Sequence, residues 1–136
     1  FPISKQEVKM NTFDHERLDS YQVSIKFVAL GNTVVEKLPR GRAYLADQLQ
    51  RAALSIALNI AEGAGEFSQK DKARFYRMAL RSATECAAIL DVCKCLNLAD
   101  EQNLTAGREL LLRIVSMLTK MVKNITDSGT GTGTFQ

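Results

Sequence analysis

The sequence contains no tryptophan, two prolines and one histidine among its 136 residues. Because proline interrupts α-helices, a chain whose only prolines are Pro2 and Pro39 has long stretches in which helices can continue. One histidine, His15, and three cysteines exclude most metal centres and catalytic triads. No apolar run approaches the ~20 residues that a membrane span needs. We therefore expect no metal or cofactor site and no membrane contact.

The overall composition is that of a folded protein. Apolar residues make up 46% of the chain and charged residues 24%, which distinguishes it from a disordered chain. A length of 136 residues suits one compact domain. Basic residues exceed acidic ones by 18 to 15, and the net charge of +3 permits an anionic partner without requiring one.

The three cysteines, Cys86, Cys93 and Cys95, lie close together in one segment. A disulfide framework normally uses an even number of cysteines spread along the chain. We therefore expect reduced, buried thiols that pack as small apolar side chains. The first nine residues lack the apolar core of a signal peptide, so the expected location is the cytoplasm.

Apolar residues recur at helical spacing in four segments, and no segment shows the pattern of a strand. The expected helices cover residues 14–38, 43–62, 69–96 and 100–125. Short connections make consecutive helices antiparallel, so the predicted fold is all-α, an up-down-up-down four-helix bundle. The bundle is expected over residues 14–126, with an N-terminal extension at 1–13 and a disordered Gly/Thr tail at 127–136.

Helix-stop and helix-start residues support these boundaries. Pro39 and Gly41 end the first helix, and the glycines of residues 63–65 allow a positive φ at the end of the second. Ser68 and Asp71 have the spacing of an N-terminal cap for the third helix.

A polar stripe follows the second helix, facing polar residues of the third. The residues of this stripe on the second helix are Gln48, Arg51, Ser55, Asn59 and Glu62, and their partner on the third helix is Glu85. The two helices are antiparallel, so the numbers of two facing residues add up to a constant, here about 133. Gln48 is then expected to meet Glu85 and Asn59 to meet Arg74, while Arg51 lies between Ser82 and Glu85. Such a ladder would fix the register of the two helices. The alternative is a ligand or nucleic-acid site.

The best functional candidate is a basic face on the third helix. Its residues lie within roughly 60° of one another and are Lys70, Arg74, Arg77 and Arg81. Four cations in a line could follow a phosphate backbone. The alternative is a solvated face neutralised by Glu66, Asp71 and Glu85. Since that face has no aromatic residue for base stacking, we expect backbone contacts and little base readout.

Four apolar residues of the second helix lie off its expected core face: Leu54, Ala57, Leu58 and Ala61. A contiguous apolar patch is unusual on a monomer, so these residues predict a homo-oligomer.

Catalysis is not expected. The bundle lacks the Glu-x-x-His pairs of di-metal enzymes, and the Gly63-Ala64-Gly65 sequence is too short to be a nucleotide-binding loop.

Residues 48–65 read QLQRAALSIALNIAEGAG, and Ser68, Asp71, Arg74 and Phe75 continue the pattern. This stretch resembles the signature Q-L-x-R-A-x-x-S-I-x-x-N-I-A-E-G-x-G of the 23S rRNA intervening-sequence protein family. The resemblance extends over about residues 13–125. Glu66 and Arg81 depart from it, since members often have a basic residue and a glycine there.

The resemblance implies a bacterial, non-enzymatic four-helix bundle that assembles as a ring-shaped homopentamer. A related branch, the accessory proteins of diversity-generating retroelements, binds nucleic acid and a reverse transcriptase. We therefore expect either a nucleic-acid-binding accessory protein, with RNA or DNA as partner, or a scaffold that engages a protein partner.

Overall fold

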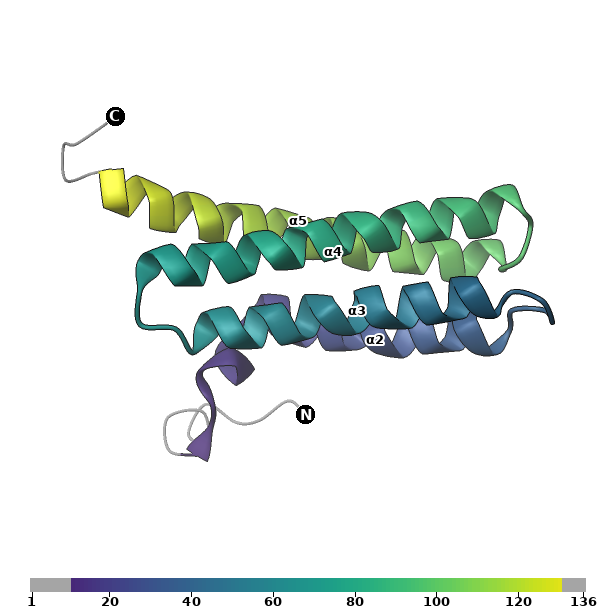
Figure 1. Cartoon of the computed structure of the whole chain (residues 1–136), viewed down its shortest axis with the longest axis horizontal. Helices are drawn as coiled ribbons and strands as arrows, with labels where there is room; N and C mark the ends of the chain where they lie inside the picture. Colours follow the sequence, from purple (N-terminus) through teal and green to yellow (C-terminus); the bar gives the residue numbers. More distant parts are fainter. Residues whose placement is uncertain (1–10, 131–136) are drawn as a thin grey trace.

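The computed structural model describes residues 11–130, with side chains through Asp127. Its elements are a short 3₁₀ helix and four long helices: η1 (Asp14–Arg17), α2 (Asp19–Glu36), α3 (Ala43–Ala64), α4 (Gln69–Cys95) and α5 (Glu101–Thr130). Figure 1 shows the long helices side by side, each running opposite to the one before it. Each helix packs on its neighbours in sequence, and α2 also packs on α5. The predicted all-α four-helix architecture is confirmed, and residues 11–130 contain no strand.

The core contains large side chains from all four long helices, and α4 adds several small ones. Phe27 of α2, Ile56 of α3 and Leu118 of α5 are almost completely buried. The core face of α4 contributes mainly alanine and cysteine, including Ala79, Ala83 and Cys86, all at 0% exposure.

The first expected helix is interrupted. Leu18 has an extended backbone (φ −88°, ψ 127°) and separates η1 from α2. Before this break, the His15 ring lies between Phe13 and Tyr21, at centroid distances of 5.7 and 4.6 Å. The aromatic cluster and the contact of η1 with α3 turn the chain away from the α2 axis. The prediction of one continuous helix over residues 14–38 was therefore wrong at its start.

The end of α3 also differs from the expectation. Gly65 has a φ of −86°, so no positive φ is needed there. Gly63 is required for another reason, because a Cβ at this position would lie 2.6 Å from the Tyr76 ring. Positive φ occurs instead at Gly41 (92°) and at Asn97 (57°), in the turns that follow α2 and α4.

The start of α4 was predicted correctly, since the Ser68 Oγ accepts a hydrogen bond from the Asp71 backbone N–H at 3.2 Å. Asp100 caps α5 in the same way and accepts from the Asn103 N–H at 2.8 Å. The helix α5 continues to Thr130, five residues beyond the expected end, and includes the first four residues of the predicted tail. The rest of that tail, and residues 1–10 of the predicted extension, lie outside the described residues.

No helix within residues 11–130 combines the length and apolar content that crossing a bilayer requires.

Candidate nucleic-acid interface

The four predicted cations all lie exposed on the outer face of α4. From Lys70 to Arg81 the helix rises about 16 Å, with a cation at nearly every turn. Arg74 is paired with Asp71 at 3.8 Å, in a contact where both side chains are about half exposed. Lys70, Arg77 and Arg81 form no ion pair with any residue in the described part of the chain. Positive charge on this face is therefore only partly neutralised.

The Arg74 guanidinium lies over the Phe75 ring, 4.5 Å from its centroid, and its Nη1 is 4.0 Å from the Met78 sulfur. The predicted contact of Arg74 with Asn59 was wrong. Phe75 is only half-buried beneath this guanidinium, and Tyr76 takes the core position that follows it. Arg74 is thus held on the outer face of α4 by neighbours on its own helix.

The polar ladder between α3 and α4 is present, with a different register in its middle. The Ser82 Oγ donates to the Ser55 Oγ at 2.8 Å, and the Asn59 Nδ2 donates to the Ser55 carbonyl and Oγ at 2.9 and 3.0 Å. At the far end, the predicted contact of Gln48 with Glu85 is present at 3.1 Å.

Facing residue numbers sum to 137 for Ser55 with Ser82, rather than to the expected 133. Side chains on a helix lean toward its N-terminus, which in an antiparallel pair raises the sum by about two and accounts for part of this difference. The longer side chains of Gln48 and Glu85 still meet at a sum of 133. Arg51 and Glu62 are not part of the ladder, because both are exposed and bond to no described residue. A shallow hollow of about 190 Å³ lies between Ser55, Asn59 and Arg81, so the ladder borders the basic face.

Lys72 is a residue that the sequence interpretation missed. Its Nζ donates to the Gly63 and Ala64 carbonyls at 2.9 and 3.0 Å, across the α3–α4 turn. These carbonyls belong to the last turn of α3, where no helical N–H is available to them. The sequence contained one signal for this contact: a lysine eight residues after the end of one helix, on the inner side of the next helix. Lys72 is thus committed to the fold, in contrast to Lys70.

The cysteines divide into two classes. Cys86 and Cys93 are completely buried, as expected, whereas Cys95 is exposed, so the prediction of buried thiols was wrong for Cys95. Burial, with a smaller contribution from the Glu85 charge, raises the pKa of Cys86 to about 12. Burial also raises the pKa of Cys93 and that of Tyr76. The two buried thiols are therefore protonated at neutral pH and unsuited to act as nucleophiles.

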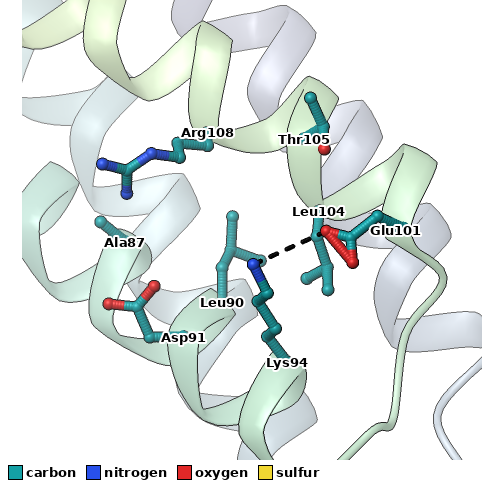
Figure 2. A pocket seen from close by; sticks show the side chains of 8 residues that line it. All are labelled: Ala87, Leu90, Asp91, Lys94, Glu101, Leu104, Thr105 and Arg108. Carbon is teal, nitrogen blue, oxygen red and sulfur yellow. Dashed lines mark ion pairs between the residues drawn. The ribbon is translucent and has the colours of Figure 1, made fainter.

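A groove between α4 and α5, with a volume of about 150 Å³, forms a second polar surface. Figure 2 shows that its rim carries Asp91 and Lys94 from α4 and Glu101 and Arg108 from α5. The Lys94 Nζ lies 3.7 Å from the Glu101 carboxylate. Two acidic and two basic side chains leave this groove without a preference for anions. No group of three or more His, Cys, Asp or Glu among the described residues could hold a metal ion.

The predicted interface patch on α3 is smaller than expected. Leu54 and Leu58 are 50% and 55% exposed, but Ala57 is buried and Ala61 is half-buried. The exposed part of the patch is therefore limited mainly to the two leucines. Next to Leu54, a groove of about 400 Å³ lies between α2 and α3.

Comparison with known families gives one match. The family described as 23S rRNA-intervening sequence protein matches residues 16–120, which is more than half of the chain and includes α2, α3 and α4 completely. No curated protein matches the chain. The match includes the polar ladder and the basic face of α4, so both lie in the part of the chain on which the assignment depends. This protein is a member of the 23S rRNA-intervening sequence protein family.

Proposed function

We propose that this protein is a non-enzymatic accessory protein that binds RNA and DNA without sequence preference, through the outer face of α4. One observation supports this most strongly: Lys70, Arg77 and Arg81 are exposed in one line and form no ion pair with a described residue. Contacts to phosphates supply most of the affinity of nonspecific nucleic-acid binding. Phosphates are common to all sequences, so such a face positions a strand without reading it.

The proposal includes assembly as a ring-shaped homo-oligomer in the cytoplasm. Leu54 and Leu58 lie one turn apart on α3 and are half exposed, which supports a contact between subunits. Five subunits is the number that the family resemblance implies. A ring would repeat the basic face, and several weak contacts to one strand would add through avidity. The free thiols of α4 agree with a reducing compartment.

Light scattering and one variant test the assembly. We expect a mass several times the 15.1 kDa of one chain, and we expect Leu58→Glu to dissociate the assembly by placing an unpaired charge in the contact. The exposed Leu112 of α5 supplies a control, since Leu112→Glu adds the same charge away from α3. A parent protein that is monomeric at micromolar concentration would contradict the proposed ring.

The binding experiment compares two charge reversals. The variant Arg77→Glu/Arg81→Glu changes the proposed face, and Arg108→Glu/Arg113→Glu makes the same change at exposed arginines of α5. Each lowers the net charge by four, from +3 to −1, so a difference between them cannot come from total charge. In low salt, we expect the α4 variant to bind mixed-sequence RNA and DNA at least about tenfold more weakly than the parent. The α5 variant should remain close to the parent.

The second candidate function is a scaffold that engages a protein partner. The exposed leucines of α3 and the adjoining α2–α3 groove favour it, because apolar surface of this kind also suits a partner helix. Salt dependence separates the two functions, since phosphate contacts weaken steeply with ionic strength. If both charge-reversed proteins bind nucleic acid as the parent does, the basic face is only solvated and the scaffold is favoured.

A further inference from the structure

Phe67 is the most exposed aromatic residue among those described. Its relative exposure is 101%, compared with 73% for Phe13 and 56% for Tyr44. Single apolar side chains on a surface are common and need no function. Phe67 differs in its location, because it lies in the α3–α4 turn three residues before Lys70, where the basic face of α4 begins.

The turn that carries Phe67 is anchored on both sides. Before it, the Lys72 ammonium bonds to the carbonyls of Gly63 and Ala64. After it, the Ser68 Oγ caps α4 through the Asp71 N–H. The backbone of Phe67 therefore has a defined position relative to α4, so binding of a ligand has to order only the Phe67 side chain and not the turn.

The position of Phe67 extends the line of cations. Three residues of chain span at most about 11 Å, so the Phe67 Cα lies within that distance of the Lys70 Cα. The four cations cover about 16 Å along α4 in the other direction. A strand whose phosphates follow Arg81, Arg77 and Lys70 would reach the turn with its next bases near the Phe67 ring.

We propose that Phe67 stacks on an unpaired base and makes this surface a site for single-stranded nucleic acid. This inference rests on the proposed function and narrows its ligand class. In a duplex the faces of the bases are already covered by their neighbours, whereas in a single strand they are open to an aromatic ring. Stacking tolerates every sequence because each base has a π face, so it agrees with binding that lacks sequence preference.

The basic face was expected to have no aromatic residue, and Phe67 lies next to that face rather than on it. On α4 itself, Tyr76 is buried and Phe75 is half-buried beneath the Arg74 guanidinium, so neither ring is open to a base. The aromatic residue lies in the turn before the helix, outside the periodic pattern that defines the face.

The experiment measures affinity for a mixed-sequence single strand and for the duplex of the same sequence, at one salt concentration. We expect Phe67→Ala to weaken single-strand binding by about 5- to 150-fold and to leave duplex binding within about twofold. Tyr44→Ala, at an exposed aromatic residue at the other end of α3, is the matched control and should change neither affinity.

A second variant reports the stacking directly. The chain has no tryptophan, so Phe67→Trp introduces a single tryptophan, whose emission can be excited apart from that of the three tyrosines. Its emission should be quenched on adding the single strand and stay nearly constant with the duplex. Phe67→Ala binding the single strand as well as the parent, together with unquenched emission, would overturn the inference and leave the proposed function standing. A parent that binds neither form would overturn both.

Discussion

The two sides of α4 differ in how their polar groups are used. On the side that faces α3, the Lys72 ammonium bonds to two carbonyls and the Ser82 hydroxyl bonds to Ser55. On the outer side, Arg77 and Arg81 bond to no residue within the described chain. Groups on the inner side hold the bundle in register, so they are fixed by the fold. Groups on the outer side are not needed for folding, and their charge is available to a ligand.

Breaking the inner side at Gly63 should have the largest effect on stability. A Cβ there would meet the buried Tyr76 ring at 2.6 and 2.8 Å, and we expect Gly63→Ala to lower the free energy of unfolding by about 2 kcal/mol. Gly65→Ala is the control, because its nearest neighbours are 3.8 Å away and its φ is −86°. That change should be neutral or slightly stabilising. Denaturant titration measures both, and equal effects would contradict the packing that we describe.

Removing the Lys72 ammonium should have an intermediate effect. Lys72→Met keeps much of the side-chain volume but removes the ammonium donor from both carbonyls, of which only that of Gly63 keeps a backbone bond, from the Glu66 N–H. We expect a loss of about 1.5 kcal/mol in the free energy of unfolding, at the lower end for bonds to charged groups because the site is only half-buried. Lys70→Met, on the outer side, is the matched control and should have almost no effect. If the two variants unfold at the same temperature, the bonds of Lys72 to the Gly63 and Ala64 carbonyls do not stabilise the turn.

Neutralising the outer side should have the smallest effect on stability. Arg77→Ala/Arg81→Ala removes two exposed side chains that form no ion pair with a described residue. The free energy of unfolding should change by less than about 0.5 kcal/mol, the usual range for surface sites. A loss of more than about 1 kcal/mol in denaturant titration would place these arginines in the fold and remove the contrast between the two sides.

Much of the fold follows from local patterns in the sequence. Apolar periodicity predicts all four helices, and the Ser68 to Asp71 spacing predicts the start of α4, because both depend on residues that are neighbours on one helix. The extended residue Leu18 was not predictable in this way. It depends on aromatic contacts around His15 and on packing of η1 against α3.

The sequence also predicts which residues form the basic face, but not what surrounds them. A helical wheel places Ala57 beside Leu54 without showing that Ala57 is buried. It counts Lys72 as one more cation, since the carbonyls that it binds belong to another helix. The exposure of Phe67 depends on the path of a turn, which no periodicity describes. These properties arise between elements, so they require the structure.

The salt dependence of binding tests the central claim most directly. Each phosphate that the protein neutralises on a single strand contributes about −0.7 to the slope of log K against log salt. If Arg77 and Arg81 each contact a phosphate, Arg77→Ala/Arg81→Ala should bind more weakly and with a slope shallower by about 1.4 than that of the parent. A variant with the slope and affinity of the parent would contradict the assignment of this face to nucleic acid.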